Sequence, residues 1–185
     1  MDTWVWIVII AAVVVLLLAA WAVVQRRRRT QLREGFGPEY DRTVDETGSR
    51  REAESELEQR QKRREELDIR PLSPAARDRY MNQWRDTQAR FVDDPGAAAG
   101  DADRLVQEVM RERGYPTDDF EQRAADISVD HPRLVENYRS AHSIAASHER
   151  GEAETEDLRQ ALVHYRSLFE ELLETSDTEG MDAGR

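Results

Sequence analysis

The first apolar pattern in the chain is an uninterrupted run from Trp4 to Val24, which contains no charged residue and no proline. As a helix these 21 residues would reach about 30 Å, the thickness of a bilayer's hydrocarbon core. Tryptophans near both ends of the run, at positions 4, 6 and 21, are typical of the headgroup level of a membrane. The pattern therefore predicts a transmembrane helix over residues 4–24, anchored by Trp4, Trp6 and Trp21.

A basic cluster follows this run directly and predicts its orientation. Only Met1, Asp2 and Thr3 precede the run, whereas Arg26, Arg27, Arg28 and Arg29 follow it. The positive-inside rule then places the N-terminus outside the cell and the rest of the chain in the cytoplasm, with the arginines next to anionic lipid. A signal peptide is disfavoured, because it would have a basic N-terminal region and a shorter apolar core. An exported C-terminal domain remains the alternative.

Residues 25–48 form the collar and a juxtamembrane segment with a helical stripe. Leu32, Phe36, Tyr40 and Val44 recur every four residues, and the helix is expected to restart near Pro38. This stripe has two possible partners, the membrane surface and the distal domain, and the sequence does not choose between them.

Residues 49–70 are mostly charged. From Ser49 to Asp68 the apolar positions are Ala53, Leu57 and Leu67, and no heptad seam joins them. Acid-to-base pairs spaced by four, such as Glu56 with Arg60, stabilise a solvated helix. We therefore predict a helical spacer arm, with a partner-binding charged helix as the alternative.

Residues 71–175 show the helical period in several segments separated by capping and breaking residues. Ser73-Pro74 opens the first helix, which ends before Asp93-Asp94-Pro95. The others are expected from about Ala98 to Gly114, from the capping box of Asp118 and Glu121, from Asp130 to Gly151, and from Thr155 onward. Short links imply antiparallel neighbours. A polar tail over residues 176–185 is expected to be disordered.

These patterns together predict an all-α chain: a transmembrane helix (4–24), a basic collar (25–48), a charged spacer (49–70), a small antiparallel helical bundle (71–175) and a tail (176–185). The 185 residues carry a net charge of −11 and include no cysteine. The acidic balance argues against nucleic-acid binding, and the lack of cysteine excludes disulfides and thiolate metal sites. The transmembrane run holds no ionisable residue, which argues against a channel or transporter.

The candidate chemistry is sparse. An antiparallel hairpin of the last two helices would bring His142 and His164 to a similar level, yet neither helix has the Glu-x-x-His spacing of bundle metal sites. Asp93-Asp94 and Asp118-Asp119 are explained as helix caps, and His131 and His148 lie near helix ends. The aromatic residues at helical spacing are expected in the core rather than around a pocket: Tyr80, Trp84, Phe91, Tyr138, Tyr165 and Phe169. We predict no catalytic, cofactor or metal residues.

Several stretches within residues 32–173 carry a resemblance to known proteins: FGPEYDRTV, DETGSRREAESEL, LDIRPLSPAARDRY, RFVDDP, ERGYP, DDFEQRAAD, SVDHP and ENYRSAHSIA. Together they resemble a family of bacterial single-pass membrane proteins with a helical C-terminal domain. The family has no assigned activity, so the resemblance implies no site residue.

With the patterns above, we expect a non-enzymatic, membrane-tethered module that binds another protein. A small hydrolase or metal enzyme and an exported cell-envelope protein are the alternatives.

Overall fold

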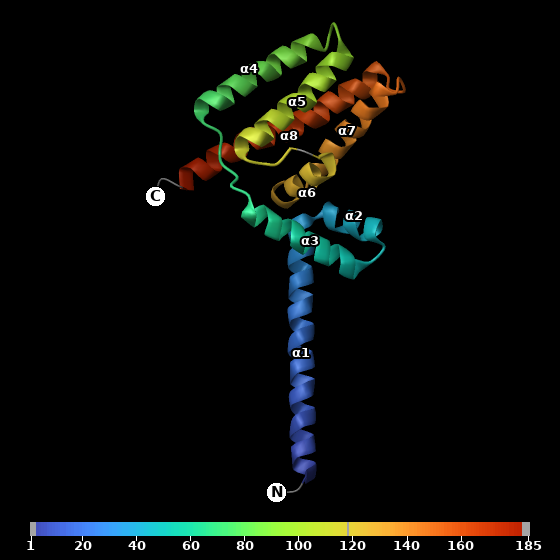
Figure 1. The fold of residues 1–185 in the computed structure, drawn as a ribbon, viewed down its shortest axis with the longest axis vertical. Coiled ribbons are helices and arrows are strands. Elements are labelled where there is room, and N and C mark those ends of the chain that lie inside the picture. Colours follow the sequence, from blue (N-terminus) through green and yellow to red (C-terminus); the bar gives the residue numbers. More distant parts are fainter. Residues whose placement is uncertain (1–2, 118, 183–185) are drawn as a thin grey trace. The chain divides into compact units, whose positions relative to one another are not determined.

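The computed structural model describes residues 3–117 and 119–182, without the side chains of residues 3, 5–11 and 175–182. Over these residues the chain is all-α, as predicted, and contains helices α1 to α8 with no strand (Figure 1). It divides into two compact units, Met1–Glu58 and Gln59–Arg185. Helix α3 (Arg50–Glu66) begins in the first unit and ends in the second.

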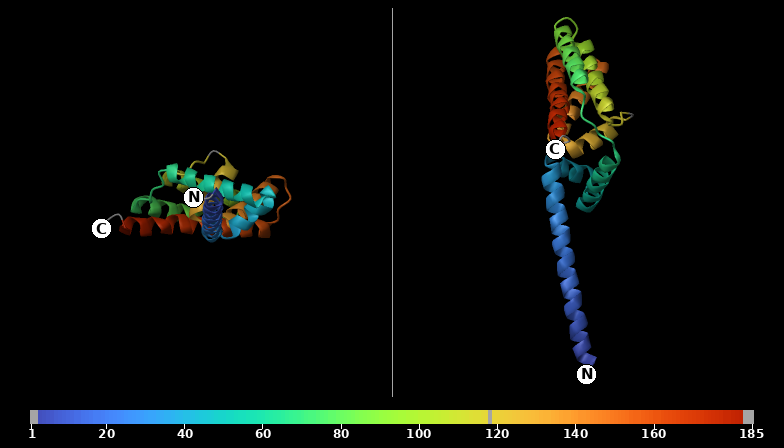
Figure 2. Two further views of the ribbon diagram at one scale, coloured as in Figure 1. Left: turned by 90° about the horizontal axis from the view of Figure 1, so that it is seen from below. Right: turned by 90° about the vertical axis from the view of Figure 1, so that its left-hand side faces the viewer.

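The first unit begins with α1 (Thr3–Phe36), one continuous helix that contains the predicted transmembrane run and the four arginines that follow it (Figure 2). Within the described residues, no helix combines the length and hydropathy that membrane crossing requires. The predicted span over residues 4–24 depends in part on residues 5–11, whose side chains lie outside the described set.

Helix α2 (Pro38–Thr47) restarts at Pro38 as expected, after a turn at Gly37. Of the predicted stripe, Leu32, Phe36 and Tyr40 are buried and Val44 is half-buried. The fourfold spacing therefore marks a buried face that runs from the end of α1 into α2.

The charged segment is helical as expected, but α3 is not exposed to solvent on all sides. Ala53 and Leu57, one helical turn apart, are fully buried. Glu54 accepts a hydrogen bond from the Tyr40 hydroxyl at 2.8 Å. Ala53 and Leu57 give α3 a narrow buried stripe, which the average polarity of its sequence does not reveal because most of its residues are charged.

The second unit is a helical bundle built from two antiparallel hairpins. Helices α4 (Pro74–Arg90) and α5 (Pro95–Arg113) form one hairpin, and α7 (Val135–Glu149) and α8 (Thr155–Asp182) form the other. Helix α8 packs against both α7 and α5 (Figure 1). The short α6 (Phe120–Asp130) precedes α7 and packs against it. A single apolar core joins these helices and includes every predicted core aromatic residue except Phe91, which is only half-buried.

Local capping explains where these helices begin and end. Ser73 caps α4 by accepting from the Ala76 amide, and Asp94 caps α5 with Pro95 in its first turn. Helix α5 thus starts three residues before the expected Ala98. Gly114 ends it in the left-handed conformation, as predicted.

Three other helix ends differ from expectation. Asp119 caps α6 by accepting from the Gln122 amide, while Asp118 lies outside the described residues. Helix α7 begins at Val135 rather than at Asp130, because residues 131–134 form a turn that closes α6. Helix α8 continues through residues 176–182 of the predicted tail, where no proline interrupts it and each added residue costs little.

Candidate functional site

The predicted membrane-anchor residues lie along α1. Trp4 and Trp21 are exposed, and the side chain of Trp6 lies outside the described residues. Arg26 and Arg27 are exposed. The other two arginines of the collar pair within the first unit: a guanidinium nitrogen of Arg28 lies 3.7 Å from Glu58, and one of Arg29 lies 3.6 Å from Glu54. Two arginines of the collar are therefore exposed, and the other two form ion pairs with α3.

The second unit contains a groove between α4 and α8, with a volume of about 280 Å³. Five residues line it from each helix: Arg77, Met81, Trp84, Arg85 and Gln88 from α4, and Arg166, Phe169, Glu170, Leu173 and Glu174 from α8. Each set recurs at spacings of three, four and seven along its helix, so both walls are single helical faces. This arrangement is a groove of the kind that holds an elongated ligand.

Stacked aromatic rings form the floor of the groove. Trp84 and Phe169 stack with their ring centroids 4.7 Å apart and their planes 20° apart. Both rings are nearly buried, at 5% and 2% exposure, whereas Met81 is 38% exposed at the rim. The floor is therefore buried and largely apolar, and the flexible thioether of Met81 lies beside it.

An unmet hydrogen-bond donor lies in the same floor. The Trp84 indole nitrogen Nε1 is buried and has no hydrogen-bond partner among the described residues. A buried N–H without an acceptor costs about 1–3 kcal/mol. A ligand that brought an acceptor to this nitrogen would recover part of that free energy.

The two walls of the groove differ in charge. The α4 wall carries Arg77 and Arg85 and no acidic residue. On the α8 wall Arg166 donates to Glu170 at 2.7 Å, so this pair is internally neutralised and Glu174 adds a negative charge. Although the whole chain has a charge of −11, the α4 wall is basic.

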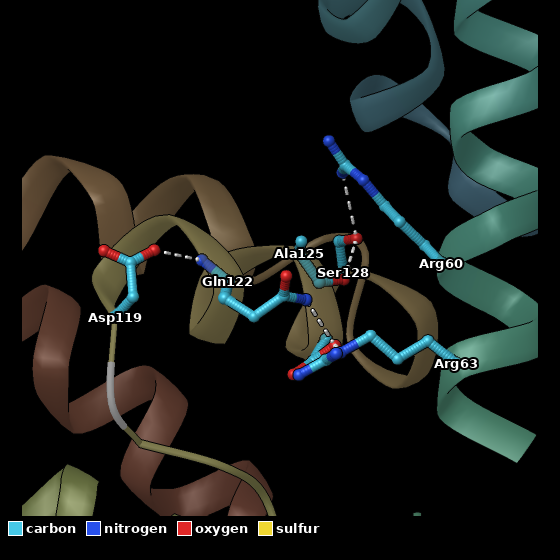
Figure 3. A network of polar contacts seen from close by, with 7 residues as sticks. Arg60, Arg63, Asp119, Gln122, Ala125 and Ser128 are labelled. Carbon is cyan, nitrogen blue, oxygen red and sulfur yellow. Dashed lines mark hydrogen bonds and ion pairs between the residues drawn. The ribbon is translucent and has the colours of Figure 1, made fainter. Parts of the chain in front are cut away.

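A second polar site lies where the end of α3 meets α6 in the second unit (Figure 3). Arg63 donates from Nε to Asp126 at 3.0 Å, and Arg60 donates to the Ser128 hydroxyl at 3.3 Å. Gln122 also donates to Asp126, at 2.9 Å. Asp126 is fully buried, and its second carboxylate oxygen has no partner among the described residues. These contacts hold the last turns of α3 on α6.

The same attachment continues to the end of α6. Asp130 accepts from Arg64 Nε at 2.5 Å and from the Tyr115 hydroxyl at 2.5 Å. Burial, reinforced by the Asp130 charge, raises the pKa of the Tyr115 phenol. Tyr115 therefore remains a hydrogen-bond donor at neutral pH.

A buried charged cluster follows in the turn after α6. His131 is buried, with Nδ1 3.4 Å from a Glu171 carboxylate oxygen and Nε2 without a partner among the described residues. The fully buried Arg113 donates to the Leu172 carbonyl at 2.9 Å and to the Arg70 carbonyl at 3.4 Å. Desolvation lowers the pKa of His131; Glu171 and Asp130 oppose this effect, and Arg113 adds to it. These contacts tie α5 and the turn after α6 to α8.

Two of the other histidines have structural surroundings, and the third, His164, is half-buried on α8. His142 stacks on Phe120 with ring centroids 3.6 Å apart. His148 lies against Gly96, at the start of α5. Across the described residues, no group of three or more His, Asp or Glu side chains is arranged to hold a metal ion.

The groove is the feature that sequence reasoning did not identify. Trp84 and Phe169 are core residues, as expected, but they also form the floor of the groove. The spacing of Arg77, Met81 and Arg85 along α4 was the available signal, because it places one apolar and two basic side chains on the face of Trp84. The α8 wall could not be paired with this face from the sequence.

Comparison with known proteins gives no guide to the ligand. No family model matches the chain, and the searches of curated proteins and of solved structures likewise find no match.

Proposed function

We propose that the chain is a single-pass, membrane-anchored, non-enzymatic protein whose second unit binds another protein through the α4–α8 groove. The observation that carries this proposal is the groove itself, with its stacked Trp84 and Phe169 floor and its charged walls. Grooves between two helices, apolar at the base and polar at the rim, are a recurrent way to bind the apolar face of a peptide helix.

The size of the groove favours a polypeptide ligand. Its α4 wall extends from Arg77 to Gln88, which is about 16 Å at 1.5 Å per residue. A volume of about 280 Å³ accepts one or two large side chains rather than a dinucleotide-sized cofactor. A short helix that inserts an anchor side chain at Trp84 matches both dimensions.

The membrane anchor is proposed from the sequence of residues 4–24 and the arginines that follow it. An uncharged run of this length, tryptophans near its ends and basic residues on one side favour a span with the N-terminus outside and the second unit in the cytoplasm. In this proposal the anchor raises the local concentration of the groove near membrane-bound partners.

Two reporter fusions test the anchor. A C-terminal reporter that is active only in the cytoplasm should be active on the full chain, and one that is active only outside should be silent. The reverse result would favour the exported cell-envelope alternative.

Photo-crosslinking in intact membranes tests the binding function. A crosslinker at Met81 should give a protein adduct, whereas one at Val92, 85% exposed and outside the groove, should not. Recovery of only lipid and self adducts from both positions would contradict the proposal.

A further inference from the structure

We infer that the α4–α8 groove selects an amphipathic helix that is acidic on the flank facing α4. This inference rests on the proposed protein-binding function and specifies the chemistry of the partner. It follows from three features: the unequal charges of the two walls, the exposed Arg85 side chain, and the Trp84 indole N–H in the floor, which lacks an acceptor.

Arg85 is the side chain that gives the α4 wall its selectivity. It is exposed, and its one hydrogen bond among the described residues runs to the Asn82 side-chain oxygen at 3.1 Å. No described carboxylate pairs with it, unlike Arg166, whose charge is matched by Glu170 within α8. A partner's carboxylate can therefore bind Arg85 without displacing an ion pair of this chain.

Arg77 extends the same basic wall. It lies eight residues before Arg85 on α4, which places the two Cα atoms about 12 Å apart along the helix. An acidic residue on a partner helix can therefore meet Arg85 at one end of this wall. Charge matching of this kind fixes the register of a bound helix and rejects partners of the wrong sign.

The floor between the arginines receives the partner's apolar face. Met81 and Trp84 lie between Arg77 and Arg85 in sequence. On a short partner helix, the apolar anchor side chain and the acidic residues beside it would therefore lie on adjacent stripes. The buried Trp84 Nε1 favours an occupant with an acceptor, such as a carboxylate or an amide oxygen.

The α8 wall sets the opposite flank. Glu174 is exposed and has no partner among the described residues, and the Arg166–Glu170 pair contributes no net charge. An acidic residue on this flank would face repulsion from Glu174, whereas a neutral or basic one would not. The groove thus distinguishes the two orientations of a helix that is acidic on one side only.

Matched peptide probes test this inference on the full chain in nanodiscs of zwitterionic phosphatidylcholine. Both probes are 14-residue helices with the same apolar stripe; one carries two glutamates eight residues apart on one flank, and the other carries lysines at the same positions. Anisotropy of a dye on the peptide gives the affinity. The indole N–H resonance of Trp84, assigned by its loss in Trp84→Phe, shows whether the floor is contacted.

We expect the acidic probe to bind at least tenfold more tightly than the basic probe and to shift the Trp84 resonance. Arg85→Glu should abolish or reverse this preference. Arg133→Glu, which changes an exposed arginine on the turn after α6, should preserve it. Circular dichroism establishes that both variants are folded.

Other outcomes would overturn the inference. Equal binding of both probes, unaffected by Arg85→Glu, would mean that the groove accepts apolar helices regardless of charge. Binding of neither probe, or a crosslink from position 81 to a second copy of this chain, would exclude the acidic helix as the occupant. In each case, photo-crosslinking in intact membranes still tests whether the groove binds a protein at all, because that experiment does not use the designed peptides.

Discussion

Trp84 on α4 stacks on Phe169 of α8 at a centroid distance of 4.7 Å, and this one contact both joins the two helices and forms the floor of the groove. Folding and binding therefore share these residues. Substitutions at the floor will change stability together with affinity, so binding is best tested at the exposed rim, where Arg85 can be changed without opening a cavity.

Trp84→Ala should destabilise the second unit by about 3–5 kcal/mol, because it removes a buried aromatic ring and leaves a cavity against Phe169. The measurement is urea unfolding of the full chain followed by circular dichroism. Val163→Ala, which truncates a half-exposed residue of α8, should change stability by less than about 0.5 kcal/mol. Similar losses for the two variants would show that Trp84 is not part of a packed core.

Gly114→Ala should be strongly destabilising, whereas Gly100→Ala in the same helix should stabilise. Gly114 has a φ of +102°, and a Cβ there would lie 2.3 Å from the Asp68 carbonyl oxygen. The left-handed conformation alone costs an L-residue about 1–2 kcal/mol, and the clash with backbone adds to it.

Gly100 is the matched control for this prediction. A Cβ at Gly100 meets nothing within 4 Å, so alanine there gains about 0.5–1 kcal/mol of helix propensity. Thermal unfolding of the two variants gives the comparison. Equal midpoints would contradict the left-handed cap at Gly114.

Arg63→Ala should loosen the end of α3 from α6. It leaves the buried Asp126 with one fewer donor, at a cost of about 1–3 kcal/mol. Hydrogen exchange should quicken at the amides of residues 120–130. Lys62→Ala, which removes an exposed neighbour, should leave this exchange unchanged.

A double-mutant cycle separates the Arg63 contact from other effects of the substitution. In an Asp126→Ala background, Arg63→Ala should cost clearly less than it does alone. Additive losses would show that the two side chains do not interact.

His131 should make the second unit less stable as the pH falls through about 6.5. Burial lowers the pKa of this imidazole in the folded state, so the unfolded chain binds more protons between the folded value and the unfolded value of about 6.5. As the pH is lowered across that window, the free energy of unfolding decreases, and it levels off below the folded pKa. Above the window, this histidine adds no pH dependence.

The measurement is urea unfolding at pH 7.5 and pH 5.5 for the natural chain and for His131→Gln. The glutamine keeps a polar group beside Glu171 but does not titrate. We expect a smaller loss of stability at pH 5.5 in the variant, relative to its own value at pH 7.5. The same loss in both proteins would contradict a buried neutral imidazole.

The tyrosines of the core should remain protonated well into the alkaline range. Burial, with the Asp103 charge next in size, raises the pKa of Tyr138 to about 12, although the Arg123 guanidinium opposes it. The difference in ultraviolet absorbance at high pH between the natural chain and Tyr138→Phe gives the titration. A Tyr138 transition near pH 10 in the folded protein would contradict its burial.

Much of the helical architecture follows from local sequence. Ser73-Pro74 and Gly114 mark helix ends that the structure has at those residues, because capping and left-handed turns depend on a few neighbouring atoms. Helix α8 likewise begins at Thr155, where the sequence predicts its start. The fourfold stripe at Leu32, Phe36 and Tyr40 likewise identifies buried residues. Helix ends and buried stripes of this kind depend on residues close together in the sequence, so they can be predicted without knowing the tertiary structure.

Long-range contacts were beyond the same reasoning. Nothing local in α3 shows that Arg63 reaches Asp126, a residue more than sixty positions away, or that Ala53 and Leu57 are buried within a charged helix. The groove was missed for the same reason, since it requires the face of Trp84 to meet that of Phe169. Pairing of helix faces is decided by the whole core rather than by any one segment.

The most direct test of a membrane-anchored groove that binds protein is reciprocal photo-crosslinking in intact membranes. A crosslinker at Met81 should yield one dominant protein adduct, and a crosslinker placed in that partner's acidic helix should return to α4 or α8. Arg85→Glu should reduce both adducts at least tenfold, while Arg133→Glu should not. Adducts that consist only of lipid or of this chain, or that are equally strong from Val92, would contradict the proposed function.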